Sequence, residues 1–191
     1  QRELLGLGHA IYQAAPTFNN DEILIILGDT VFDVNLSQIT KLETSSLGVK
    51  EVEDPRRFGV AELKDGFISK LIEKPEIPTT NLALVGLYYI KNSALLTESI
   101  EELMGKNIKT KDEYQLTDAL QLMIEKGEKF STFPVEGWYD CGKPETLLST
   151  NRFILSQNGE SRKIESVVIN DPVYISPSAK IKNSVIGPYA T

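Results

Sequence analysis

The sequence predicts an α/β fold in which a mixed sheet of Rossmann-like character is flanked by helices. Two turns support this prediction: Leu27-Gly28-Asp29 ends one apolar run, and Tyr139-Asp140-Cys141-Gly142 comes after another. Each places an aspartate where a strand ends, beside a glycine that permits a sharp turn. In open α/β sheets, ligands bind beyond the carboxyl ends of the strands. Because Mg²⁺ prefers oxygen ligands, Asp29 and Asp140 predict a metal-dependent nucleotide site.

The first ninety residues alternate between helix and strand signals. A helical pattern runs through Tyr12 and stops at Pro16, and a short helix is expected at 34–42 with Asn35 as its N-cap. Lys64-Asp65-Gly66 is a strong hairpin turn that joins two strands. Five strands are expected in this part of the chain, at 23–27, 47–52, 58–63, 67–72 and 82–90.

Helical patterns dominate the next part of the chain, and the composition changes in the tail. Three helices are expected, at 92–104, 114–127 and 145–157. In the tail, apolar residues alternate with small polar residues and prolines, and Ile175–Ala179 shares its four-residue offset with Ile186–Ala190. This pattern predicts the opening coils of a hexapeptide β-helix, with a plain pair of strands as the alternative. The predicted organisation is one domain at 1–157, a linker at 158–165 and the start of a β-helix at 166–191.

Composition narrows the class of protein. The 191 residues are 41% apolar and 25% charged, which suits a globular domain with a core. The net charge of −7 argues against nucleic acid as the main partner, because binding a phosphate backbone needs a basic face. No apolar run approaches the roughly 20 residues needed to span a bilayer. The single cysteine fits a reducing compartment, and we expect a cytoplasmic protein without membrane partners.

Seven short motifs follow one another across residues 1–142. They are Gln1-x4-Gly6-Leu7-Gly8-His9-Ala10, Leu27-Gly28-Asp29, Asp54-Pro55-Arg56-Arg57-Phe58-Gly59-Val60, Glu73-Lys74-Pro75, Asn81-x4-Gly86-Leu87-Tyr88-Tyr89, Glu113-Tyr114-Gln115-Leu116-Thr117-Asp118 and Trp138-Tyr139-Asp140-Cys141-Gly142. In this order they resemble the sugar-1-phosphate nucleotidyltransferases, especially the glucose-1-phosphate thymidylyltransferase or uridylyltransferase type. Each motif alone is weak, but seven in order make coincidence implausible. The tail resembles the left-handed β-helix that many members append.

The resemblance implies a reaction and three catalytic residues. A sugar 1-phosphate, expected to be glucose 1-phosphate, attacks the α-phosphorus of dTTP or UTP and releases pyrophosphate. Asp29 and Asp140 are implied to bind Mg²⁺, which lowers the barrier between two anions. Lys74 is implied to pair with the phosphate of the sugar. The bland alternatives are that the aspartates cap turns and that Lys74 belongs to a surface ion pair.

The resemblance also implies a set of substrate-binding residues. Glu73 would accept hydrogen bonds from sugar hydroxyls, and the backbone of Gly59 would lie against the sugar, where a Cβ would collide. Further implied substrate contacts are Leu84 and Gly86 in the sugar pocket, Lys111 near the phosphates, and Gln1 with Gly6 at the pyrimidine base. The amide of Gln1 offers both a donor and an acceptor, which suits a uracil or thymine edge. The lone His9 is expected to be structural.

One segment of the family pattern is missing. The resemblance includes a Gly-rich loop that wraps the triphosphate with backbone amides and basic side chains, and this sequence contains none. We therefore expect the domain to be incomplete at its N-terminus, the β-helix to be cut short, and this chain alone to be inactive. A homo-oligomer is expected. The alternatives are a non-catalytic sugar-nucleotide-binding or regulatory subunit of the same fold and, more remotely, a hexapeptide acyltransferase.

Overall fold

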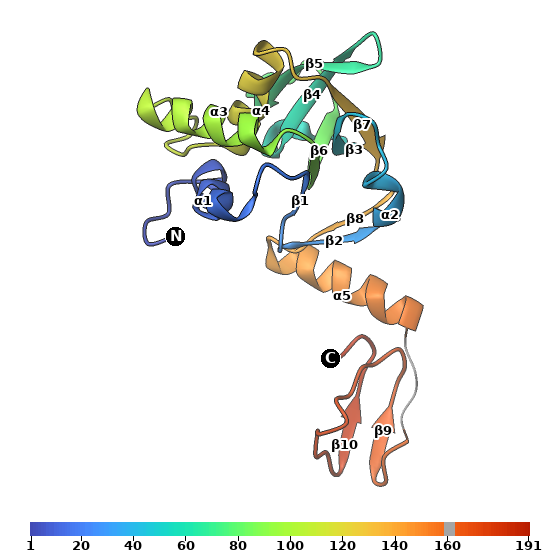
Figure 1. The fold of residues 1–191 in the computed structure, drawn as a ribbon. Coiled ribbons are helices and arrows are strands. Elements are labelled where there is room, and N and C mark those ends of the chain that lie inside the picture. Colours follow the sequence, from blue (N-terminus) through green and yellow to red (C-terminus); the bar gives the residue numbers. More distant parts are fainter. Residues whose placement is uncertain (159–162) are drawn as a thin grey trace. The chain divides into compact units, whose positions relative to one another are not determined.

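The computed structural model describes residues 1–158 and 163–191 (Figure 1). The chain divides into two compact units. The first unit contains Gln1–Gly28 and Phe32–Trp138, and the second contains Asp29–Val31 and Tyr139–Thr191. Residues 159–162 of the predicted linker lie outside the described residues.

Helices and strands alternate along the chain as the sequence pattern predicts. The helical segments are α1 (Leu7–Ala14), η1 (Ala15–Thr17), α2 (Leu36–Ile39), η2 (Pro55–Arg57), α3 (Ser93–Gly105), α4 (Leu116–Glu125) and α5 (Pro144–Asn158). The strands are β1 (Ile23–Ile26), β2 (Thr30–Asp33), β3 (Ser45–Glu51), β4 (Gly59–Lys64), β5 (Phe67–Glu73), β6 (Leu82–Ile90), β7 (Phe130–Pro134), β8 (Gly137–Asp140), β9 (Val167–Ile169) and β10 (Ser184–Ile186).

A six-stranded mixed sheet forms the centre of the first unit. Its order is β5-β4-β6-β3-β7, and β1 pairs with β6. Strands β3 and β7 are parallel, whereas β6 runs antiparallel to β1, β3 and β4. Strand β6 is buried along nearly its whole length, which explains its continuous apolar sequence. The predicted mixed sheet flanked by helices is confirmed.

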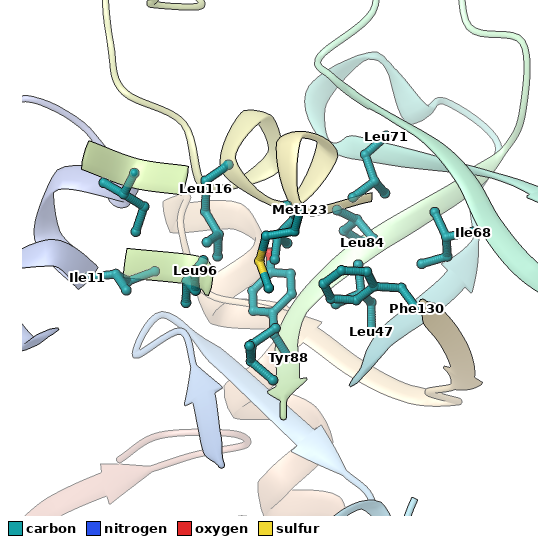
Figure 2. Close-up of a cluster of buried hydrophobic side chains, with 14 of the residues drawn as sticks. Ile11, Leu47, Ile68, Leu71, Leu84, Tyr88, Leu96, Leu116, Met123 and Phe130 are labelled. Atoms are coloured by element: carbon teal, nitrogen blue, oxygen red, sulfur yellow. The ribbon is translucent and has the colours of Figure 1, made fainter. Parts of the chain in front are cut away.

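The two faces of β6 belong to two different hydrophobic clusters. Leu84, Tyr88 and Ile90 pack in the larger cluster, which includes residues of α1, α3 and α4. Figure 2 shows side chains of these helices meeting those of the strands in that cluster. The intervening residues Val85, Leu87 and Tyr89 pack in a smaller cluster with Ile39 of α2 and with Val135. Successive side chains of a strand point to opposite faces, so one apolar strand supplies both cores.

The register of β6 shifts at Gly86. Leu47 of β3 pairs with Tyr88, but Val49 pairs with Leu84, so β6 carries extra residues at this point. Gly86 has a φ of 84°, a left-handed conformation that favours glycine. A Cβ on Gly86 would lie 2.8 Å from Cδ1 of Leu27, so the bulge also lets the end of β1 pack closely on β6. Strand β6 therefore contains a β-bulge at Gly86.

Several elements differ from their predicted bounds. Asn35 caps α2 by accepting a hydrogen bond from the Ser37 amide at 3.1 Å, as predicted, but the helix ends at Ile39. Strands β2 and β8, which form a two-stranded sheet, were not predicted. The helix expected from residue 114 begins at Leu116, because residues 110–113 form a turn. None of the helices in the described ranges is long and apolar enough to cross a membrane.

The second unit contains α5 and the tail. The ring of Tyr139 stacks on Phe153 of α5, with ring centroids 4.0 Å apart. The side-chain amide of Asn151 donates to the Tyr189 carbonyl at 3.0 Å, and the Arg152 guanidinium lies 4.7 Å from the Tyr189 ring centroid. Strands β9 and β10 pair in parallel, with Val168 opposite Val185. Stacked coils require parallel pairing, but one such pair is common to both predicted alternatives, and the β-helix stays a prediction.

Candidate functional site

Asp29 and Asp140 lie beside each other in the second unit. Asp29 occupies the turn before β2, and Asp140 is the last residue of β8. The Cys141 amide donates to the Asp29 carbonyl at 2.8 Å, which ties the two segments together. The Gly142 amide donates to Oδ1 of Asp140 at 2.8 Å and orients that carboxylate.

Both carboxylates face the space above Gly142. A Cβ placed on Gly142 would lie 3.0 Å from Oδ1 of Asp140 and 3.7 Å from Oδ2 of Asp29. A side chain at Gly142 would therefore crowd the Asp140 carboxylate and touch that of Asp29. Proteins usually hold Mg²⁺ through one or two carboxylates, with water and substrate phosphate oxygens completing the octahedron. The pair fits that donor set, and Thr30 adds a hydroxyl 3.4 Å from Oδ1 of Asp29.

Glu73 and Gly59 meet on paired strands in the first unit. They are register partners at the end of β5 and the start of β4. The Thr117 hydroxyl donates to Oε2 of Glu73 at 2.6 Å, and the Glu73 side chain is only 8% exposed. A Cβ on Gly59 would lie 2.9 Å from the Thr117 hydroxyl and 3.1 Å from both Oε2 of Glu73 and Cδ1 of Leu84. Glu73, Leu84 and Thr117 thus pack closely around Gly59, and a hydrogen bond fixes one oxygen of the Glu73 carboxylate.

Lys74 leaves β5 in an unusual backbone conformation. Its φ is 43°, which non-glycine residues rarely adopt, and its amide donates to the Phe58 carbonyl at 3.1 Å. Its ammonium lies 3.4 Å from Oε1 of Glu73 and is partly exposed. Non-glycine residues held at positive φ cluster at functional sites, where the surrounding structure holds them in place.

Lys74 and Lys111 line a basic pocket of about 690 Å³. The pocket is lined by Arg56, Arg57, Lys74, Pro75, Glu76 and Lys111. Within it, Lys111 lies 3.8 Å from the well-exposed carboxylate of Glu76. Four cations around one pocket, in a chain of net charge −7, make a local anion-binding surface.

Arg56 is held at this pocket by Asp54. Its Nε and Nη2 lie 2.7 and 2.8 Å from the two carboxylate oxygens of Asp54. These bonds, and that from the Arg56 amide, lower the pKa of Asp54 to about 2. Both residues belong to the motif at 54–60, but the sequence alone did not predict that Arg56 lines the pocket.

Gln1 and Gly6 lie at the start of α1. The side-chain amide of Gln1 donates to the Gly6 carbonyl at 2.9 Å and lies 3.0 Å from Nδ1 of His9. Gln13 approaches the other ring nitrogen of His9 at 3.1 Å. The lone histidine therefore has two amide partners that the sequence did not reveal. These contacts are consistent with a structural role for His9, which stays a prediction.

Gly6 packs directly against the segment that leads into α4. A Cβ on Gly6 would lie 2.7 Å from the Tyr114 carbonyl oxygen and 2.8 Å from Cβ of Glu113. The Tyr114 amide donates to the Leu5 carbonyl at 2.8 Å, and the Gly8 amide donates to the Tyr114 carbonyl at 2.8 Å. Gly6, which is expected at the pyrimidine base, is thus connected through residues 113–114 to Lys111 at the basic pocket.

The first turn of α4 contributes side chains whose importance the sequence did not show. Thr117 bonds Glu73, as described, and Gln115 is buried beside it. The pKa of Asp118 is raised, chiefly because the carboxyl is buried, and also by the negative charge of Glu73, while a hydrogen bond with Thr110 opposes the rise. The motif 113–118 marked this stretch, but its contacts cross more than forty residues and need the fold to become visible.

Of the predicted residues, the structure brings two groups together. Gly59, Glu73 and Leu84 pack closely together, and the neighbouring Lys74 shares the basic pocket with Lys111. Asp29 and Asp140 form the other group. Gly86 faces the Leu27 side chain. The Leu27 amide also donates to the Gly86 carbonyl at 2.9 Å, so Gly86 packs against the residue that follows β1.

Comparison with known proteins identifies the family. The family model for nucleotidyl transferases matches residues 1–157. The low-salt glycan biosynthesis nucleotidyltransferase Agl11 of Haloferax volcanii is 34% identical over 166 residues, covering 83% of this chain and 45% of that protein. The bifunctional protein GlmU of Methanocaldococcus jannaschii is 37% identical over 185 residues, covering 94% of this chain and 43% of that protein. The chain thus spans less than half the length of these relatives.

The fold agrees with this match. A crystal structure of UDP-glucose pyrophosphorylase complexed with UDP-glucose superposes with a TM-score of 0.68 at 27% identity, covering 82% of this chain and 64% of that one. The resemblance read from the seven motifs is confirmed at the level of the family. Through residues 1–157, the chain belongs to the sugar-1-phosphate nucleotidyltransferase family.

Proposed function

We propose that the protein containing this chain transfers a nucleotidyl group from dTTP or UTP to a sugar 1-phosphate, and that glucose 1-phosphate is the sugar substrate. The observation that carries the proposal is the meeting of two lysines, Lys74 and Lys111, at a basic pocket next to the fixed carboxylate of Glu73. A sugar phosphate matches this combination, because its phosphate can pair with the lysines and its hydroxyls can donate to the carboxylate. The similarity to a UDP-glucose pyrophosphorylase supports glucose and a uridine nucleotide.

The sugar phosphate is held by complementary charges. Lys74 and Lys111 bind its phosphate oxygens, and the carboxylate of Glu73 accepts hydrogen bonds from ring hydroxyls. Thr117 keeps Glu73 in place, so the carboxylate loses little freedom when the sugar binds. The backbone of Gly59 lies against the sugar, while Leu84 and Gly86 form the wall behind it.

The nucleotide is recognised separately. Gln1 and Gly6 read the pyrimidine edge, the first with its amide and the second with backbone groups made accessible by the absence of a Cβ. Asp29 and Asp140 would hold Mg²⁺, which would supply positive charge to the phosphate oxygens. A sugar phosphate oxygen forms a bond to the α-phosphorus, the bond from that phosphorus to the bridging β-phosphate oxygen breaks, and pyrophosphate leaves with the electron pair. Positioning and charge neutralisation suffice, without a covalent enzyme intermediate.

The tail and the assembly complete the proposal. Residues 166–191 begin a left-handed β-helix after the linker at 158–165, and copies of the protein associate into a homo-oligomer. Parallel pairing of β9 with β10 supports the first point. The exposed Val168 and Val185 support the second, because they are register partners and form an apolar pair that another copy can cover.

The test is a titration of this chain with glucose 1-phosphate, compared with glucose and with inorganic phosphate. We expect glucose 1-phosphate to bind more tightly than either fragment, and Lys74→Met to weaken it about tenfold or more through loss of a charge-assisted contact. Pyrophosphate release by the gene product containing this sequence then separates the enzyme from a non-catalytic binding subunit. Equal, weak binding of all three compounds would contradict the proposal.

A further inference from the structure

Lys111 sits in a two-residue turn with an unfavourable backbone. Thr110 and Glu113 bracket the turn through two backbone hydrogen bonds, of 3.0 and 3.2 Å. Between them, Lys111 has a φ of 54° and Asp112 a φ of 63°. Tight turns with both central residues at positive φ normally contain Asn-Gly or Asp-Gly, because side chains with a Cβ disfavour this conformation. A Lys-Asp pair in this conformation needs support from its surroundings.

That support comes from Gln115 and Asp118. The buried side-chain amide of Gln115 donates to the Thr110 carbonyl at 3.2 Å and to Oε2 of Glu113 at 3.1 Å, so one side chain bridges both ends of the turn. Asp118 lies one helical turn further on, with its carboxyl interacting with Thr110 and its Oδ2 buried without another hydrogen-bond partner.

The residues that hold the turn are themselves anchored. Thr117, between them, donates to Glu73 at 2.6 Å, and Tyr114 pairs through its backbone with Leu5 and Gly8. The start of α4 is therefore fixed to the end of β5 and to the segment before α1. In contrast, the one ion pair of the Lys111 ammonium within residues 1–158 and 163–191 is a 3.8 Å approach to the well-exposed Glu76. The backbone of the turn, rather than this ion pair, decides where Lys111 points.

We propose that Gln115 and Asp118 are positioning residues, which hold the strained 110–113 turn so that Lys111 reaches the phosphate of the sugar substrate. This inference rests on the proposed function of Lys111. Neither residue touches the substrate. Each acts by keeping the lysine in place before the substrate arrives, which lowers the ordering cost of binding.

The experiment compares five variants by titration with glucose 1-phosphate: Gln115→Ala, Asp118→Asn, Lys111→Ala, and the double variants of Gln115→Ala with Lys111→Ala and with Asp112→Gly. We expect Gln115→Ala and Asp118→Asn to weaken binding about threefold to tenfold, as the loss of one or two hydrogen bonds would. In a Lys111→Ala background, Gln115→Ala should add nothing further, because the two act through the same contact. Adding Asp112→Gly to Gln115→Ala should restore most of the affinity, since glycine adopts positive φ without support.

Lys109→Ala is the matched control. It removes the same charge from the same loop, but Lys109 lies over the Tyr114 ring, 4.9 Å from its centroid, rather than at the pocket. It should leave the affinity unchanged. Thermal unfolding of each variant separates a local effect from a loss of fold. The positioning role is contradicted if Gln115→Ala and Asp118→Asn bind glucose 1-phosphate as tightly as the wild type does. It is also contradicted if Asp112→Gly does not restore the affinity of Gln115→Ala. Failure of the wild type to bind would instead contradict the proposed function.

Discussion

At the scale of single residues, the site depends on the carboxylates of Asp29 and Asp140 and on Gly142 beside them. Gly142 has no Cβ where one would lie 3.0 Å from Asp140 and 3.7 Å from Asp29. The glycine matters less for its backbone freedom than for the space it leaves. A methyl group there would occupy the region in which both carboxylates would share a cation.

Gly142→Ala is therefore expected to weaken Mg²⁺ binding while leaving the fold intact. The added methyl crowds Asp140 and forces its carboxylate to turn, which lowers affinity about tenfold, the range seen when supporting groups around a metal are altered. Isothermal titration with Mg²⁺ measures this change. Gly105→Ala is the control, because a Cβ on Gly105 would meet no atom within 4 Å. An unchanged Mg²⁺ affinity in Gly142→Ala would contradict the geometry.

At this scale the sequence could predict candidates but not partnerships. Glu73, Lys74 and Gly59 were predicted because their motifs match a known order. Thr117, which fixes Glu73 at 2.6 Å from 44 positions away in sequence, carried no local signal of that contact. Long-range hydrogen bonds of this kind depend on how α4 packs against β5, which residue spacing alone does not encode.

At the scale of elements, α3 and α4 pack side by side over the sheet (Figure 1). Buried side chains hold them together, including Leu96, Ile100 and Leu120. At the surface, Glu102 of α3 lies 2.6 Å from Lys106, one turn away, and 2.8 Å from Lys126 just after α4. Hydrogen bonds from these lysines lower the pKa of Glu102 from 4.5 to about 2.

A lowered carboxylate pKa gives a defined pH dependence. Because the folded pKa of Glu102 lies below its unfolded value, its stabilising effect is complete above about pH 4.5 and is lost as the pH falls through about 2. Glu102→Gln should therefore lower the melting temperature slightly at pH 6, less so at high salt, and much less near pH 2. Thermal unfolding of both proteins across this range checks the result. A difference that persists unchanged at pH 2 would show that Glu102 acts by another route.

Elements with strong patterns were predictable, and those without were not. The nine apolar residues of β6 and the Lys64-Asp65-Gly66 hairpin both form as expected. Strand β2 was missed because it has only four residues and half of them are exposed, so it lacks a run or a clear alternation. The turn at 110–113 was missed because Lys111 and Asp112 are not residues that usually adopt positive φ.

For the molecule as a whole, family membership and local chemistry point the same way. Residues 1–157 match the nucleotidyl transferase family, and their polar residues gather into a basic pocket and a pair of carboxylates. The family could be predicted because seven motifs follow one another across residues 1–142 in the order of that family. The choice of base and sugar could not, since it depends on the shape of the complete site.

The central claim is that Asp29 and Asp140 bind one divalent cation together. Electron paramagnetic resonance during titration with Mn²⁺, which takes the same oxygen ligands as Mg²⁺, measures this directly in the 191-residue chain. We expect one tight Mn²⁺ site in the wild type, displaced by Mg²⁺ and lost equally in Asp29→Asn and in Asp140→Asn. Retention of wild-type Mn²⁺ affinity in either single variant would contradict the claim.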